Sequence, residues 1–303
     1  MKRRIPSMAL SMTSTVLLPS WTSATEIRQL TFCCPPYNFG IEQPAWSPDG
    51  RLMVFVGSNA YPPYYEYWQY VAVFALDGGG VPDWLYAASP ASDPAWSPDG
   101  TELAFSIEDG YWFGIWVISQ GEERQLTFER GHKQPAWSSD GGLIAYATYS
   151  NEIWLVPSSG GPSARLTLGT SPSFSPDGRA MVFARDGHLW ILEFQDRSEH
   201  WLTTGPGYDR SPAWSTDGRW IAFASARHGT TDIWVIAPVG GTAVRVTTGG
   251  AWDRDPTWSP QSDAIAFCSE RSGDPNIWVA EDLPDLTIGV EETSWSAIKQ
   301  IYR

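Results

Sequence analysis

The sequence predicts an all-β fold, a six-bladed β-propeller of four-stranded blades that is closed by an N-terminal strand completing the last blade. Three observations predict this fold: a seven-residue segment that recurs six times, short apolar runs that accompany each copy, and one displaced copy of the last run ahead of the first repeat. No run of 18 or more apolar residues occurs, so we expect no transmembrane helix of ordinary length.

The recurring segment has the form Pro-x-aromatic-Ser-x-Asp-Gly. Its aromatic positions are 46, 96, 137, 174, 214 and 258, with spacings of 50, 41, 37, 40 and 44 residues. A period near 40 to 45 residues is typical of one propeller blade. The Asp-Gly pair allows the positive φ of a tight hairpin between the first and second strands. Because the sixth copy has Gln261-Ser262 at these two positions, we expect a looser hairpin there.

Further short runs follow each segment, and their β-branched and aromatic residues, bounded by turn residues, predict strands. The expected second strands are residues 52–56, 103–107, 144–148, 181–185, 221–225 and 265–269. The expected third strands are residues 71–76, 115–119, 153–157, 189–193, 233–237 and 277–281. The expected fourth strands are residues 83–87, 124–128, 164–168, 200–204 and 244–248.

The sixth repeat lacks a fourth run of its own. The matching letters, Arg-Gln-Leu-Thr-Phe, stand instead at residues 28–32, before the first repeat. We therefore expect residues 28–32 to form the outer strand of blade six, which joins the two ends of the chain and removes an exposed sheet edge.

Two sets of repeated aromatic residues are expected to pack between blades, because each large ring can bury about 150–250 Å². The first-strand set is Trp46, Trp96, Trp137, Phe174, Trp214 and Trp258. The third-strand set is Trp116, Trp154, Trp190, Trp234 and Trp278.

The chain divides into three parts in this interpretation. Residues 1–24 are expected to be a signal peptide, since basic Lys2–Arg4 precede an apolar run and Ser23-Ala24 offers a cleavage site; the alternative is a disordered cytosolic leader. The propeller is expected over residues 25–281. Residues 282–303 are expected to form a tail with a short amphipathic helix that docks on the ring or serves as a partner-binding tag. Export predicts a periplasmic or secreted protein.

Charge and cysteine content exclude some function classes. A net charge of −14 without a basic stripe repels phosphate backbones, so nucleic-acid binding is disfavoured. The cysteines Cys33, Cys34 and Cys268 lack metal-ligand spacing, so no zinc site is expected. Free thiols are the expected state, while a strained vicinal disulfide or a pairing with Cys268 stays open.

The repeat Pro-x-Trp-Ser-Pro-Asp-Gly, followed by Ile-Ala-Phe, Ile-Trp-Val and Arg-Gln-Leu-Thr runs, resembles the WD-like repeat of the TolB β-propeller family. The resemblance covers roughly residues 26–281 and implies the propeller fold. TolB itself is a periplasmic protein of the Tol–Pal envelope system and carries an additional N-terminal α/β domain, whereas this sequence predicts the propeller only. Closely similar repeats occur in the propellers of prolyl-oligopeptidase-type peptidases.

Loops before each first strand and between second and third strands are expected on one face, where propellers usually bind ligands. Polar residues gather there, and the tripeptides at 208–210 and 252–254 should place their charges side by side on the rim. They predict a recognition rim or a cation site, or else Asp–Arg pairs that tie adjacent loops. The candidates are Asp93, Asp209, Arg210, Asp253, Arg254 and Asp255.

Aromatic residues form a second candidate surface. The long loop of blade one and the corresponding loop of blade two should present neighbouring rings, either to a partner or as a cover over the edge of blade one. These residues are Tyr61, Tyr64, Tyr65, Tyr67, Trp68, Tyr111 and Trp112.

No catalytic set assembles from the sequence. The four histidines fall in different blades, and no Gly-x-Ser-x-Gly elbow or calcium loop occurs. We therefore expect an exported, monomeric, non-catalytic scaffold that binds a protein or carbohydrate partner, with no cofactor and no metal. The alternative is a cation-dependent enzyme acting at the rim, such as a lactonase or polysaccharide lyase, which a tightly bound stoichiometric divalent ion would favour.

Overall fold

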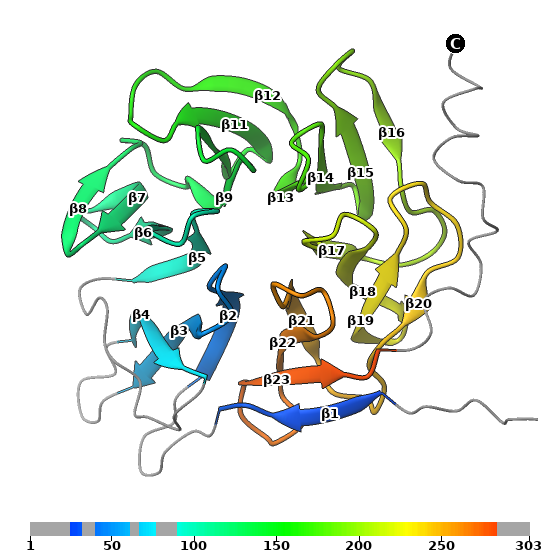
Figure 1. The fold of residues 1–303 in the computed structure, drawn as a ribbon. Coiled ribbons are helices and arrows are strands. Elements are labelled where there is room, and N and C mark those ends of the chain that lie inside the picture. Colours follow the sequence, from blue (N-terminus) through cyan, green and yellow to red (C-terminus); the bar gives the residue numbers. More distant parts are fainter. Residues whose placement is uncertain (1–24, 32–39, 61–66, 77–89, 284–303) are drawn as a thin grey trace, which may run out of the picture.

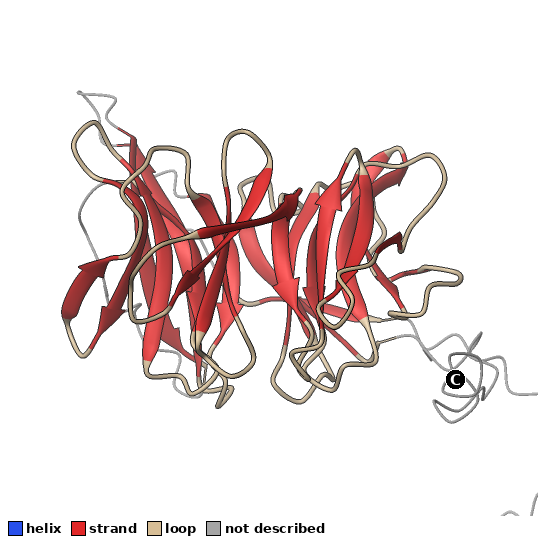
Figure 2. Cartoon of the chain, turned by 90° about the horizontal axis from the view of Figure 1, so that it is seen from above, coloured by secondary structure: helices blue, strands red, loops and turns tan. Residues whose placement is uncertain are grey.

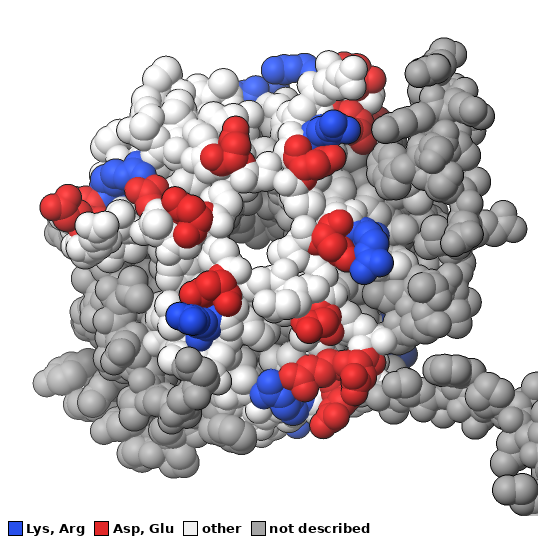
Figure 3. All heavy atoms as spheres, viewed as in Figure 1, with Lys and Arg blue, Asp and Glu red and all other residues white. Residues whose placement is uncertain are grey.

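The computed structural model describes residues 25–31, 40–60, 67–76 and 90–283, and these residues form six antiparallel sheets arranged as blades around a ring (Figure 1). No helix occurs among the described residues. The strands run between two faces on which the connections gather (Figure 2), and the centre of the ring is hollowed (Figure 3). The predicted six-bladed β-propeller is confirmed.

The strands follow the chain from blade to blade, and their bounds are as follows. Blade one has β2 (Gly40–Trp46), β3 (Leu52–Ala60) and β4 (Tyr67–Ala75). Blade two has β5 (Ala91–Trp96), β6 (Glu102–Glu108), β7 (Phe113–Ser119) and β8 (Glu122–Gln125). Blade three has β9 (Lys133–Trp137), β10 (Leu143–Ala147), β11 (Glu152–Pro157) and β12 (Ala164–Leu168). Blade four has β13 (Thr170–Phe174), β14 (Ala180–Arg185), β15 (His188–Glu193) and β16 (Glu199–Trp201). Blade five has β17 (Asp209–Trp214), β18 (Ile221–His228), β19 (Thr230–Ile236) and β20 (Val244–Arg245). Blade six has β21 (Asp253–Trp258), β22 (Ile265–Ser269), β23 (Asn276–Glu281) and β1 (Glu26–Gln29).

Blade six confirms the predicted closure, because β1 pairs antiparallel with β23 from Glu26 opposite Glu281 to Gln29 opposite Trp278 (Figure 1). The pairing ends in a cap: the backbone N–H groups of Leu30 and Thr31 both donate to the carbonyl of Ile277, at 2.8 and 3.3 Å. The hydroxyl of Thr31 accepts the N–H of Ile277 at 2.9 Å in return. The chain ends are therefore joined by hydrogen bonds as well as by strand pairing.

The same threonine cap recurs within blades two, four and five. There Thr127, Thr203 and Thr247 accept the N–H groups of the third strands at 2.8–2.9 Å. The chain therefore turns away from the sheet at the repeated Leu-Thr or Val-Thr residues. As a result, β8, β16 and β20 end before the last residues of the predicted fourth strands. The predicted fourth strand of blade one, residues 83–87, lies outside the described residues.

Six apolar clusters form the core, one between each pair of neighbouring blades. The cluster between blades six and one, for example, joins Met53 and Phe55 to Ile277 and Val279. Each cluster contains one member of the first-strand aromatic set, in ring order Trp46, Trp96, Trp137, Phe174, Trp214 and Trp258. The third-strand tryptophans pack in the same clusters. The predicted packing role of both sets is confirmed.

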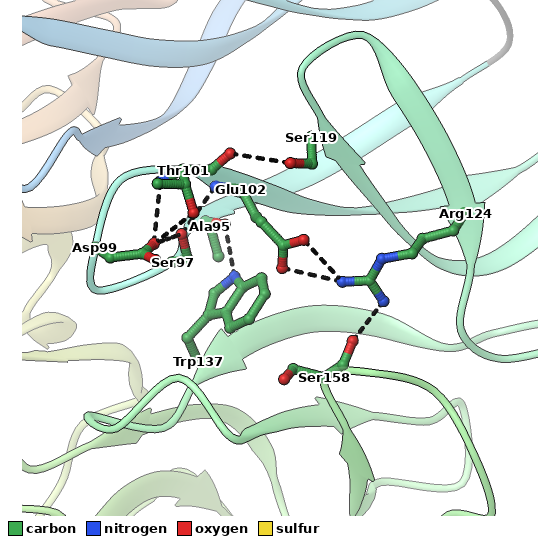
Figure 4. Close-up of polar contacts among 9 residues, drawn as sticks. All are labelled: Ala95, Ser97, Asp99, Thr101, Glu102, Ser119, Arg124, Trp137 and Ser158. Carbon is green, nitrogen blue, oxygen red and sulfur yellow. Dashed lines mark hydrogen bonds and ion pairs between the residues drawn. The ribbon is translucent and has the colours of Figure 1, made fainter.

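The repeated hairpin turn is a compact polar unit, shown for blade two in Figure 4. The hydroxyl of Ser97 donates to Asp99 at 2.6 Å and accepts the backbone N–H of Glu102 at 2.9 Å. A second blade contributes to the same region, since the indole N–H of Trp137 donates to the carbonyl of Ala95 at 3.0 Å. Ser97 thus fixes the turn, and Trp137 docks the next blade on it; Trp258 makes the corresponding bond to the carbonyl of Ala213 at 3.1 Å.

The sixth hairpin is not looser than the others, and that prediction is wrong. The N–H of Ser262 donates to the carbonyl of Ser259 at 2.9 Å, as Gly50 does to Ser47 in blade one. Ser262 adopts the positive φ of 59° that glycine provides elsewhere. The carboxylate comes from two residues later, since Ser259 donates to Asp263 at 2.7 Å.

These turns predict that the stability of the folded ring falls at acidic pH. Hydrogen bonds from the serine hydroxyls lower the pKa values of Asp49, Asp99 and Asp140. The contribution to stability is present above the unfolded-state pKa of about 4 and is lost as the pH falls below it, because the folded state binds fewer protons there. Urea denaturation at pH 7, 5 and 3 should show this fall. A variant with Asp49→Asn, Asp99→Asn and Asp140→Asn should show a smaller fall between pH 5 and 3, and an unchanged fall would contradict the assignment.

Candidate functional site on the loop face

The two faces of the ring carry different connections. We call the face that carries the connections between second and third strands, and those leading into each first strand, the loop face. The opposite face, which carries the Ser-x-Asp-Gly turns between first and second strands, is the hairpin face.

Exposed apolar side chains gather on the loop face. Of the ten large hydrophobic side chains that are exposed among the described residues, seven lie in loop-face connections or at the strand ends next to them. These seven are Tyr111, Trp112, Phe128, Tyr149, Leu168, Tyr208 and Trp252. Leu143 and Val239 lie near the hairpin face, and Trp201 lies on outer strand β16. An uneven distribution of this kind marks an interaction surface.

Four of these rings, Tyr111, Trp112, Phe128 and Tyr149, belong to neighbouring connections of blades two and three, and we call them the aromatic cluster. The exposed fractions of Tyr111 and Trp112 are 89% and 55%. The hydroxyl of Tyr149 donates to Glu108 of blade two, which links the two blades at this face.

Cations border the aromatic cluster. The ammonium of Lys133 lies 5.4 Å from the Tyr149 ring centroid. The guanidinium of Arg130 lies 5.2 Å from the Phe113 ring, and it donates to the carbonyl of Gly110 at 2.7 Å. These contacts hold the β6–β7 connection against the β8–β9 connection, so the exposed rings stand on a supported surface.

The central channel is lined by one polar residue and one proline from each blade, around a cavity of about 170 Å³. The polar residues are Gln43, Asp93, Gln134, Ser171, Ser211 and Asp255, and all six have φ between 48° and 54°. Register shifts in β2, β5, β13, β17 and β21 fall at these positions, so a bulge turns each of these residues away from regular strand geometry.

Hydrogen bonds connect this ring from blade to blade. Asp93 receives the side-chain amide of Gln43 at 2.9 Å and the backbone N–H of Gln134 at 3.2 Å. Gln134 in turn accepts the N–H of Ser171 at 3.0 Å. Across blades five and six, Ser211 donates to Asp255 at 3.0 Å. Burial in the channel raises the pKa of Asp255, and the charges of Asp93 and Glu42 raise it further.

A separate cleft of about 300 Å³ opens where the loop-face connections of blades three and four meet the start of β17. We call it the blade 3–5 cleft. Among the residues that line it are Asn151, Leu168, Arg185, Asp186, Tyr208 and Arg210.

The paired tripeptides are placed differently from the prediction. Asp209 and Asp253 are 2% and 0% exposed, so their carboxylates do not stand on the rim, and that expectation is wrong. Arg227 binds both oxygens of Asp209 at 2.9 Å, and Arg271 binds Asp253 at 2.7 Å. Both arginines come from the same blade as their aspartate. The letters Ser-x-Arg at residues 225–227 and 269–271, shared by blades five and six, were the signal for these partners.

Arg254 does connect adjacent blades. Its guanidinium donates to Glu42 of blade one at 2.9 Å and to Glu270 of its own blade at 2.9 Å. Neighbouring loops are thus tied by an Arg–Glu pair, whereas the Asp–Arg pairs of Asp209 and Asp253 lie within single blades. Cys268 lies near these groups as a buried free thiol. Burial raises its pKa, and the charges of Glu42 and Glu270 raise it further.

The candidate residues therefore fall into separate places. Asp93 and Asp255 line the channel, Asp209 and Arg210 line the blade 3–5 cleft, and Tyr111 and Trp112 belong to the aromatic cluster. Tyr61, Tyr64 and Tyr65 lie outside the described residues, as do the side chains of Tyr67 and Trp68. The same holds for residues 1–24, Cys33, Cys34 and the tail from residue 284.

Two further features concern only the part of the chain that the structure describes. No group of three or more His, Cys, Asp or Glu side chains there is arranged to hold a metal ion. None of its elements is a helix long and apolar enough to span a membrane.

Comparison with known proteins agrees with the fold. The family model of the TolB beta propeller domain, PD40, matches residues 135–285. The crystal structure of TolB from Acinetobacter baumannii is similar with a TM-score of 0.62 and 19% identity, covering 78% of this chain and 65% of that one. Oligogalacturonate lyase in complex with manganese is similar with a TM-score of 0.55 and 16% identity, covering 87% of this chain and 95% of that one. At these identities the structures show the shared fold alone.

Curated relatives match over part of their length. An uncharacterized protein of Agrobacterium fabrum, Atu1656, is 34% identical over 36% of this chain and 41% of its own length. The uncharacterized peptidase YuxL of Bacillus subtilis is 24% identical over 63% of this chain and 30% of its own length. The chain thus spans less than half the length of both relatives.

Proposed function

Since this chain carries the β-propeller repeats of the TolB family, we propose that it is a non-catalytic scaffold that binds a protein or glycan partner on its loop face. The observation that carries the proposal is the concentration of exposed rings on that face, above all the aromatic cluster of blades two and three. Tyrosine and tryptophan combine a large apolar area with a polar group, and they are frequent at the energetic centres of interfaces.

The surroundings of the aromatic cluster support binding of a partner rather than a role in which the rings only cover the edge of a blade. Tyr111 and Trp112 remain exposed although Trp112 already contacts Trp116, with 5.6 Å between the ring centroids. Arg130 and Lys133 beside the rings offer charged contacts to acidic groups of a partner. The predicted aromatic loop of blade one would extend this surface. We place the protein outside the cytoplasm on the pattern of residues 1–24.

The aromatic cluster is tested by a matched pair of double variants. Tyr111→Ala with Trp112→Ala removes exposed area on the loop face, while Leu143→Ala with Val239→Ala removes exposed area near the hairpin face. Partners captured from an envelope extract by the unaltered chain should be reduced at least tenfold by the first pair and kept by the second. Equal capture by both variants, with unchanged melting temperatures, would refute the proposed binding face.

A rim-site enzyme is the second candidate. It is supported by the lyase in complex with manganese among the similar structures, and by the two carboxylates that face the channel, Asp93 and Asp255. The hydrogen bonds that already occupy Asp93 make the scaffold the better supported function.

A further inference from the structure

The blade 3–5 cleft shares no lining residue with the channel or the aromatic cluster, and two of its four charged side chains are already compensated. Asp209 is held by Arg227 through both carboxylate oxygens. Arg185 pairs with Glu199 at 2.7 Å, and its guanidinium lies 3.6 Å from the Trp190 ring centroid. Neither group is therefore free to receive a ligand's charge.

Two oppositely charged side chains in the cleft remain without an ion pair to any described residue. Arg210 and Asp186 have no ion pair and no side-chain hydrogen bond among the described residues, although both line the same cleft. They do not pair with each other in the structure, because an ion pair would bring nitrogen and oxygen within 4.0 Å and none is formed between them. A ligand with one charge of each sign would satisfy both groups, whereas a simple anion would face the carboxylate of Asp186.

Rigid elements hold the backbone of both residues in place. Asp186 and Gly187 form the two-residue turn between β14 and β15, with φ values of 53° and 77°. The turn is tied to β17 because the N–H of Asp209 donates to the carbonyl of Gly187 at 3.0 Å. Arg210 is the next residue of β17, so its backbone and the Asp186 turn belong to one hydrogen-bonded unit. Sites built on such elements are preorganised.

Apolar surface completes the cleft. Tyr208 is 68% exposed, and its ring lies beside the Gly187 backbone, 3.5 Å from where a β-carbon would stand. Leu168 is 46% exposed. The cleft therefore offers a cation, an anion and an apolar wall within about 300 Å³.

We propose that the blade 3–5 cleft binds a small zwitterion with an apolar side chain, an amino acid or a short unblocked peptide. The ligand carboxylate binds the guanidinium of Arg210, which is suited to planar bidentate recognition. The ligand ammonium binds the carboxylate of Asp186, and its side chain packs against Tyr208 and Leu168. This site is independent of the partner surface on blades two and three.

Calorimetric titration of the full chain tests the proposal with leucine, phenylalanine and leucyl-leucine as probes. At least one should bind, and its amidated and N-acetylated forms should bind at least tenfold more weakly. Arg210→Gln should remove the preference for the free carboxylate, and Asp186→Asn should remove the preference for the free ammonium. Arg219→Gln, on the hairpin face, should change neither preference.

Three outcomes would overturn the proposal: no binding of any probe up to millimolar concentration, equal binding of blocked and unblocked forms, or loss of both preferences together in either variant. Maltose serves as the neutral comparison. Maltose binding that depends on Arg210 and Asp186 would instead assign the cleft to saccharides. Melting temperatures of both variants verify folding, and neither side chain makes an ion pair whose loss would destabilise the fold.

Discussion

Removal of residues 25–31 is expected to destabilise the ring strongly. These residues supply β1 and the Thr31 cap, and they also place Ile27 and Leu30 in the two apolar clusters on either side of blade six. Burial of each apolar side chain contributes up to about 1.5–3 kcal/mol. Loss of the hydrogen bond from the Ile277 N–H to Thr31 would cost about 0.5–1.5 kcal/mol more. Together these losses approach the whole stability of a typical domain, about 5–15 kcal/mol.

Thermal unfolding and size-exclusion chromatography measure this effect. The shortened chain should melt on the order of 10 °C lower or more, and it should self-associate because β23 becomes an exposed edge. A chain lacking only residues 1–24 is the control and should melt like the intact chain. Thr31→Val is the milder variant, and its free energy of unfolding should be about 1–3 kcal/mol lower, because the N–H of Ile277 then has no acceptor. An unchanged melting temperature without residues 25–31 would disprove the role of β1.

Replacement of Arg271 by alanine is expected to cost about 3–5 kcal/mol, because it leaves the buried carboxylate of Asp253 without its counter-charge. Asp253 is fully buried, and its Oδ1 has no hydrogen-bond partner among the described residues. The guanidinium of Arg271 also lies 5.1 Å from the Trp278 ring centroid, and that contact would be lost.

Urea denaturation of Arg271→Ala provides the measurement. The control is Arg219→Ala, whose side chain is 78% exposed in its pair with Asp217, so a loss below about 1 kcal/mol is expected. Asp253→Asn combined with Arg271→Met should recover most of the stability lost in the single variant, since no uncompensated charge then remains. A single-variant loss as small as that of the control would rule out the assigned role of Arg271.

The architecture could be predicted because each blade repeats the same local chemistry. Six aromatic positions near a 42-residue period identify the blades, and the Arg-Gln-Leu-Thr letters at residues 28–31 identify the closing strand. Strand ends were predicted less well, because threonine hydroxyls compete with sheet pairing at Thr31, Thr127, Thr203 and Thr247.

The candidate site could be predicted only in part, because its geometry depends on contacts between blades. The sequence placed Tyr111 and Trp112 on the correct face, where both are exposed. It could not show that Asp209 is buried, since that depends on Arg227, 18 residues later. The blade 3–5 cleft was missed for the same reason: Arg210 was a candidate, but nothing in the sequence connects it with Asp186 until the Asp209–Gly187 hydrogen bond brings their segments together.

The closing pair of strands also determines how the ring responds to mechanical force. Glu26 lies opposite Glu281, so both flanking segments leave blade six at the same end of the β1–β23 ladder. Tension applied through these two segments loads the hydrogen bonds one after another, beginning beside the Arg28–Glu281 pair. Such peeling meets little resistance, whereas a shearing load would have to break the whole ladder at once. Tension through both segments would therefore open blade six before any other blade.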